Sequence, residues 1–356
     1  MKLKKLFAGI VAVAMMATMG ATSVFAEQIV VDDKIPVDGS NFTITKTYNV
    51  TGTAPNEDFV LKQVKRESAT KSEVTDFVGT TANEHYDLTI GKAEYKGSTT
   101  GLGFSVTLPD YNNHPGIYVY TLKEDASAAT AGVTYDPNDY TLTVYAVQKD
   151  ASENGTANDL QFKVRLDVKG ATSGDNYKIT GLTNTYTSGS YKITKKVKGN
   201  MADRSKTFYF RATFSNIGNM TGSIQHNNEN VALNYTDESH TSATVDFTLT
   251  HGNDYTFTNI PKGVKVSVNE LTGENGTVIE KPATGNAVNG TYEVSYDNNQ
   301  SAEMAGTEIA TVIINDSTEN INTGVILDNA PYIALLTIVA AGAVVMIIKK
   351  RRNYED

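Results

Sequence analysis

The chain of 356 residues contains no cysteine and no tryptophan, and its five histidines lie far apart. Without cysteine, an exported protein has no disulfides, so its stability must come from packing, a metal or another covalent link. The histidine spacing forms no metal-ligand motif, and the turn Asp136-Pro137-Asn138-Asp139 is either an ordinary turn or a calcium site. We find no catalytic serine–histidine or cysteine–histidine arrangement and no phosphate-binding loop, and we expect no cofactor.

Both ends of the chain carry export and anchoring signals. Basic residues, an apolar stretch and Val24-Phe25-Ala26 predict a signal peptide at residues 1–26. Residues 332–348 carry no charge and would form a helix of about 26 Å, just long enough to cross a bilayer. The basic tail 349–352 follows directly, so the positive-inside rule places everything upstream outside the membrane.

The net charge of −9 becomes more negative once the two basic ends are set aside. An acidic protein repels nucleic acid and anionic lipid, so neither is an expected partner.

The region between residues 40 and 315 is rich in Thr, Val, Tyr, Ile, Asn and Gly and is interrupted by turn signals such as Asn-Gly. This pattern predicts an all-β fold of immunoglobulin-like sandwiches. Strands are expected at 41–50, 101–108, 116–122, 140–147, 160–168, 206–214, 243–249 and 264–268, and a loop at 63–81.

An internal repeat divides the region. Ile44-Thr45-Lys46 and Ile193-Thr194-Lys195 each open a unit, which predicts domains at 27–187 and 188–318. Residues 319–356 then form a C-terminal signal.

In each predicted domain a lysine, a glutamate and an asparagine occupy the apolar row of a period-2 strand. The first set is Lys46, Glu124 and Asn184, and the second is Lys195, Glu270 and Asn315. The order is the same in both sets, with the lysine on an opening strand and the asparagine on a closing strand.

These residue types permit a covalent reaction. Burying an ionised lysine costs several kcal/mol, so its pKa falls and the neutral, nucleophilic amine is favoured. The same surroundings favour a protonated glutamate, which can polarise the asparagine carboxamide and shuttle protons. Attack on the asparagine Cγ would expel ammonia and leave an amide, helped by an effective molarity of about 10⁵ M or more. The alternative is a buried Lys–Glu ion pair beside a hydrogen-bonded asparagine.

The sequence resembles a known family in the segments FTITKTYNVTG, YKITKKVKGNMADRSKTFYF, GVTYDPNDYTLTVYAV, FTLTHGNDYTFTNIPKGVKVSVNEL and LTNTY. They look like the isopeptide-linkage domains of Gram-positive backbone pilins of the streptococcal T-antigen type. The resemblance implies Cna-B-like β-sandwiches, a Lys46–Asn184 bond catalysed by Glu124, and a Lys195–Asn315 bond catalysed by Glu270. Lys196 competes with Lys195, but strand parity with Tyr191 and Ile193 favours Lys195.

The motif at residues 320–324, Asn-Ile-Asn-Thr-Gly, resembles a cell-wall sorting signal when followed by the apolar span and basic tail. The resemblance implies that a sortase cuts between Thr323 and Gly324 and passes the threonyl group to an amine. Asn322 stands where the family has proline, which favours a dedicated pilin sortase. Lys178 best matches the family's acceptor lysine, and Lys169 is the weaker candidate. The alternative to a sorting signal is the single span of an ordinary membrane protein. The alternative to an acceptor role for Lys178 is a solvated lysine in a turn.

The sequence therefore indicates a structural subunit, and not an enzyme, of a pilus anchored to the cell wall. The expected partners are a sortase, other copies of the chain, peptidoglycan or its precursor, ancillary pilins and a host surface. A non-polymerising wall-anchored adhesin or ancillary pilin built from the same domains is the alternative.

Overall fold

The computed structural model describes residues 34–74, 76–78, 84–149, 159–274, 277–283, 288–289 and 291–319. The predicted signal peptide, sorting motif, membrane span and basic tail lie outside these ranges. Regular structure in the described residues is β except for one 3₁₀ turn, Glu84–Tyr86. This part of the chain contains no helix with the length and hydrophobicity that a bilayer crossing requires. The predicted all-β fold is confirmed.

Two sheets enclose a first hydrophobic core, which draws its buried residues from positions 35–186. One sheet contains β1 (Val37–Asp38), β2 (Asn41–Thr51), β5 (Thr89–Ile90), β7 (Gly103–Thr107), β9 (Val133–Thr134) and the first part of β12 (Gly181–Lys198). The other has the order β11 (Leu160–Val168), β10 (Asp139–Gln148), β8 (Gly116–Glu124) and β4 (Leu61–Thr70). A small ladder joins β3 (Glu57–Phe59) to β6 (Ala93–Tyr95).

A second core draws its buried residues from positions 191–313. On one side lie the rest of β12 with β14 (Gln225–His226), β15 (Glu229–Asn230), β18 (Asp254–Pro261), β21 (Val288–Asn289), β22 (Tyr292–Tyr296) and β24 (Glu308–Ser317). On the other lie β13 (Phe208–Ser215), β16 (Asn234–Tyr235), β17 (Ser242–Leu249), β19 (Lys265–Glu274), β20 (Thr277–Ala283) and β23 (Ser301–Glu303).

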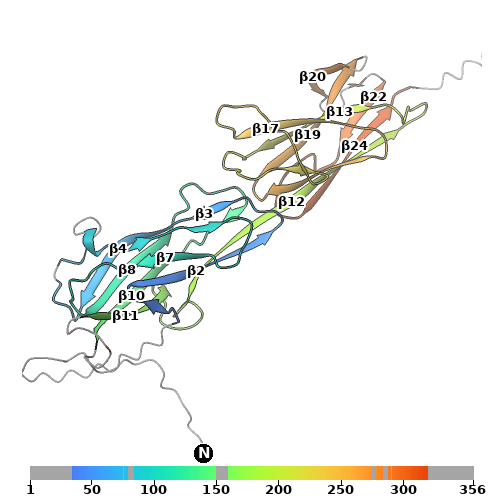
Figure 1. Cartoon of the computed structure of the whole chain (residues 1–356). Coiled ribbons are helices and arrows are strands. Elements are labelled where there is room, and N and C mark those ends of the chain that lie inside the picture. The colour runs from blue at the N-terminus through green and yellow to red at the C-terminus, as the bar shows by residue number, and fades with distance from the viewer. Residues whose placement is uncertain are drawn as a thin grey trace, which may run out of the picture.

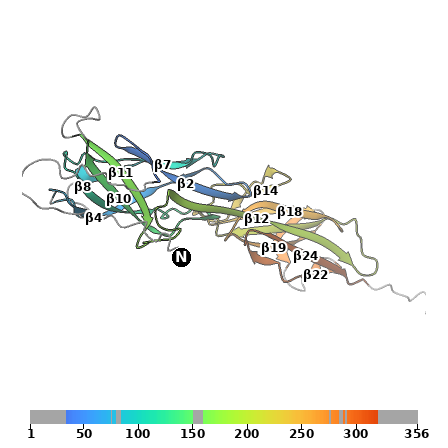
Figure 2. The same ribbon diagram turned by 90° about the horizontal axis from the view of Figure 1, so that it is seen from below.

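Strand β12 runs through both halves of the molecule, which lie end to end (Figures 1 and 2). Its residues 181–187 pair in parallel with β2, and its residues 190–198 pair in parallel with β24. Gly189 lies between the two pairings, where an added Cβ would approach the main-chain oxygen of Thr307 to 2.5 Å. The strand therefore closes the first sandwich and opens the second without a linker.

The alternation of buried and exposed side chains explains why these segments form half-buried strands. On β2, Phe42, Ile44, Lys46 and Tyr48 are buried while the intervening residues are exposed. Successive side chains of a strand point to opposite faces, so one row meets the core and the other meets water. Lys46 consequently enters the core with its apolar neighbours.

The prediction of a loop at residues 63–81 is wrong over its first half, because β4 occupies Leu61–Thr70. This strand pairs with β8 through two register shifts, at Gln63/Lys65 and Arg66/Ser68. A β-bulge inserts an extra residue and interrupts the period of two, which hid the strand from the sequence pattern.

Two buried lysine–glutamate–asparagine clusters

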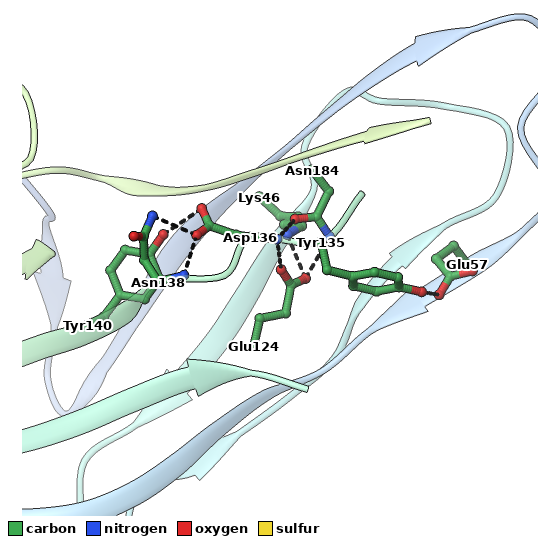
Figure 3. A network of polar contacts seen from close by, with 8 residues as sticks. All are labelled: Lys46, Glu57, Glu124, Tyr135, Asp136, Asn138, Tyr140 and Asn184. Carbon is green, nitrogen blue, oxygen red and sulfur yellow. Dashed lines mark hydrogen bonds and ion pairs between the residues drawn. The ribbon is translucent and has the colours of Figure 1, made fainter. Parts of the chain in front are cut away.

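The first cluster joins three strands across the first core. Lys46 comes from β2, Glu124 from the end of β8 in the opposite sheet, and Asn184 from β12. All three are buried, with exposed fractions of 2%, 3% and 0%. Lys46 Nζ lies 2.6 Å from Glu124 Oε1, and Asn184 Nδ2 donates to the same oxygen at 2.8 Å (Figure 3). One carboxyl oxygen of Glu124 thus contacts both the amine and the carboxamide.

The second cluster repeats the arrangement across the second core. Lys195 comes from β12, Glu270 from β19 and Asn315 from β24, and all three are fully buried. Lys195 Nζ lies 3.2 Å from Glu270 Oε2, and Asn315 Nδ2 donates to Glu270 Oε1 at 2.7 Å. Lys195 Nζ also donates to Asn315 Oδ1. The amine therefore already contacts the carboxamide with which it would react.

Strand register makes the two clusters equivalent. Lys46 lies opposite Leu182, and Lys195 lies opposite Ile313, in parallel pairings. In each case the asparagine stands two residues beyond that opposite residue. A step of two residues keeps the side chain on the same face of the sheet, so lysine and asparagine point into the same core. Lys196, the competing lysine, lies on the other face and is exposed.

The surroundings of both lysines are apolar. Lys46 Nζ lies 4.7 Å from the ring centre of Phe59, and Lys195 Nζ lies 4.4 Å from that of Phe208. Burial lowers the pKa of Lys46, against the opposing effect of Glu124. Burial likewise lowers the pKa of Lys195 to about 8, so about one molecule in ten carries the neutral amine at pH 7. Both amines are thus easier to deprotonate than an exposed lysine.

The structure adds a group to the first cluster that sequence reasoning missed. The main-chain N–H of Asp136 donates to Asn184 Oδ1 at 2.9 Å and to Glu124 Oε2 at 3.1 Å. The sequence indicated only that the segment beginning at Asp136 is an ordinary turn or a calcium site. Its carboxylate instead accepts hydrogen bonds from Asn138 and from the Tyr140 hydroxyl. No sequence pattern shows where a main-chain N–H will point in the folded chain.

The candidate acceptor lysines lie away from both clusters. Lys178 is half-buried with a left-handed φ of 55°, and its main-chain N–H donates to Asp167 Oδ1 at 2.7 Å. It borders a surface hollow of about 350 Å³. Lys169 Nζ forms an ion pair with Glu67 Oε1 at 2.9 Å. Thr323 and Gly324, the predicted cleavage site, lie outside the described residues.

Sequence comparison shows a similarity to a known protein that extends well beyond the two clusters. A protein named pilin from Streptococcus pyogenes serotype M1 is 26% identical over 359 residues, which cover 95% of this chain and 96% of the relative. This chain is similar to a pilin along nearly its whole length. The resemblance to pilins that the sequence motifs indicated is confirmed.

The pilin-like chain also matches a family profile and several solved structures. The profile, described as a domain of unknown function (DUF7601), matches residues 189–317. The crystal structure of the major pilin from Streptococcus pyogenes aligns with 20% identity and a TM-score of 0.48, covering 79% of this chain and 99% of that one. The major pilin T3.2 from the same species aligns with 17% identity and a TM-score of 0.46, with the same coverage.

Proposed function

We propose that this protein is the structural subunit of a sortase-assembled pilus on the cell surface, and that each of its two domains forms an internal Lys–Asn isopeptide bond. The domains are residues 27–187 and 188–318. The observation that carries the proposal is the pair of equivalent buried clusters, Lys46–Glu124–Asn184 and Lys195–Glu270–Asn315. A chain-wide similarity to a pilin supports it.

The reaction in the first domain starts from the neutral amine of Lys46 and the protonated acid of Glu124. The Nζ lone pair attacks Cγ of Asn184, so an N–C bond forms and negative charge develops on Oδ1. Glu124 Oε1, which contacts both nitrogens, gives its proton to Nδ2 and takes one from Nζ. The Cγ–Nδ2 bond then breaks, and ammonia leaves. Glu124 ends as it began, so each domain reacts once and without an enzyme.

The bonds would stabilise the protein in place of the disulfides that the sequence excludes. Each bond ties the opening strand of a domain to its closing strand, and the second closes a loop of 120 residue steps. A cross-link of that span stabilises a fold by about 4 to 5 kcal/mol in the chain-entropy treatment. An amide, unlike a disulfide, is not reduced by thiols.

Assembly would follow from the predicted C-terminal signal. A sortase cleaves between Thr323 and Gly324 and joins the threonyl carbonyl to Lys178 of another copy, which produces a covalent fibre. The last subunit is transferred to peptidoglycan or its precursor, and ancillary pilins join by the same chemistry. The half-buried Lys178 beside a surface hollow is compatible with an amine that a sortase-bound segment must reach.

The intact mass of the secreted region tests the internal bonds. Two bonds remove two molecules of ammonia relative to the translated sequence, and Glu124→Ala or Glu270→Ala restores one each. A mass equal to the translated sequence contradicts the proposal.

Wall extracts test assembly: a ladder that survives boiling in detergent is expected, whereas a single band favours the non-polymerising adhesin.

A further inference from the structure

A loop between β9 and β10 brings a main-chain donor to the reacting carbonyl of the first domain. The N–H of Asp136 points at Asn184 Oδ1, at 2.9 Å (Figure 3). An N–H can donate only to an acceptor, so this contact fixes which end of the carboxamide is oxygen. It directs Nδ2, the leaving nitrogen, towards Glu124.

Several independent contacts hold this loop in place. β9 pairs Thr134 with Thr185 of β12, next to the reacting asparagine. The Asp136 carboxylate accepts bonds from the main-chain N–H of Asn138 at 3.0 Å and from the Tyr140 hydroxyl at 2.6 Å. Pro137 restricts the residue before it to an extended conformation. The donor is therefore in place before the reaction begins.

We propose that the Asp136 main-chain amide is the oxyanion donor for formation of the Lys46–Asn184 bond, and that Asp136 and Tyr140 are positioning residues through their side chains. This inference rests on the proposed isopeptide chemistry. Charge develops on Asn184 Oδ1 during attack, and a donor already aimed at that oxygen stabilises the transition state without reorganisation. A charged acceptor also makes the same hydrogen bond shorter and stronger.

The second domain uses a different arrangement. There the carboxamide oxygen of Asn315 accepts from Lys195 Nζ itself, and the main-chain N–H of Glu270 donates to the Tyr296 hydroxyl. Removing the Asp136 donor should therefore slow one bond and leave the other unchanged. The rate at which the second bond forms is therefore an internal reference within the same chain.

The test follows both bonds during refolding. The secreted region is purified in denaturant from unfolded material in which neither bond has formed. It is then refolded by dilution and sampled over time. Digestion and mass spectrometry then quantify the Lys46–Asn184 and Lys195–Asn315 peptides separately. Asp136→Pro deletes the N–H, whereas Asp136→Ala keeps it and removes only the carboxylate.

In Asp136→Pro the first bond should form roughly 100-fold more slowly or worse, the usual effect of losing one oxyanion donor, while the second keeps its rate. Asp136→Ala and Tyr140→Phe should slow the first bond less. An unchanged first-bond rate in Asp136→Pro overturns the inference. If wild-type chains form neither bond, the proposed function itself fails, which is a separate result.

A folding control separates chemistry from stability. Asn184→Ala cannot form the first bond, so its melting temperature with and without Asp136→Pro reports how far the proline disturbs the fold. If the first domain fails to fold with proline, Tyr140→Phe decides: a slower first bond with an unchanged second supports the inference, and an unchanged first bond overturns it.

Discussion

Asn184 and Lys195 lie on the same strand, β12, and each belongs to a different cluster. Asn184 lies two residues beyond the partner of Lys46 in the pairing of β12 with β2, and Asn315 lies two residues beyond the partner of Lys195 in the pairing of β12 with β24. With both isopeptide bonds formed, tension would pass from β2 to β12, along the eleven residue steps from Asn184 to Lys195, and on to β24. Between Lys46 and Asn315, only this short stretch of β12 would lack a covalent bypass.

We expect Glu270→Ala to leave the second domain folded but without its bond. Glu270 contacts both the amine and the carboxamide, so its removal takes away the proposed proton shuttle. The intact mass should rise by one ammonia after correction for the substitution, and unfolding of that domain should become easier by about 4 to 5 kcal/mol. Calorimetry and proteolysis measure the second effect. Unchanged mass loss and heat resistance would show that Glu270 is not the catalyst.

The second bond should form faster as pH rises towards 8. Burial lowers the pKa of Lys195 to about 8, so the neutral fraction of its amine increases about tenfold between pH 6 and 7 and levels off above 8. Refolding at several pH values, with the Lys195–Asn315 peptide quantified over time, gives this profile. A rate that stays flat or falls over the same interval would show that the neutral fraction of the Lys195 amine does not limit the reaction.

The Asn315→Ala variant keeps Lys195 but cannot form the second bond. Its second domain should become more stable as the pH rises from about 8 to 10.5. The pKa of Lys195 is about 8 when folded and 10.5 in the reference state, so the unfolded chain binds more protons in that window. Stability rises with pH wherever the unfolded state binds more protons. Denaturant titrations at several pH values measure it, with the Lys195→Met/Asn315→Ala double variant as the control that lacks the slope.

Lys178→Ala should abolish high-mass ladders in wall extracts while both internal bonds remain. The side chain lies outside both clusters, over the ring of Tyr177, so its loss should leave both internal bonds intact. Lys169→Ala is the matched control, because that amine is held by Glu67 and Thr121. Ladders that persist in Lys178→Ala but vanish in Lys169→Ala would move the acceptor to Lys169.

Asn259→Ala should loosen the junction between the two halves without affecting either bond. Its Oδ1 accepts from the main-chain N–H of Thr53 and from Ser188 Oγ, at 3.1 and 3.0 Å, and its φ is 57°. Alanine removes these contacts and disfavours the left-handed conformation. Small-angle scattering should show a broader range of end-to-end distances. Asn113→Ala, at a similar φ of 58° in the first half, is the control and should leave the scattering unchanged.

Much of the site could be predicted because strand periodicity is local. Alternation along β2 and β12 places Lys46 and Lys195 in buried rows, and it separates Lys195 from the exposed Lys196. The absence of cysteine and the repeated order of lysine, glutamate and asparagine are likewise properties of the chain itself. Composition and strand periodicity indicate the fold class, and the repeated order indicates the kind of chemistry that the core could carry.

Tertiary structure alone decided how these groups meet. The parallel register that sets Asn184 beside Lys46 depends on pairing between strands far apart in the sequence. The bulges of β4 break the period from which a strand is predicted. The Asp136 donor is a main-chain group, and every residue except proline has one, so the sequence contains no sign of where it points. Only the folded loop aims it at the carbonyl oxygen of Asn184.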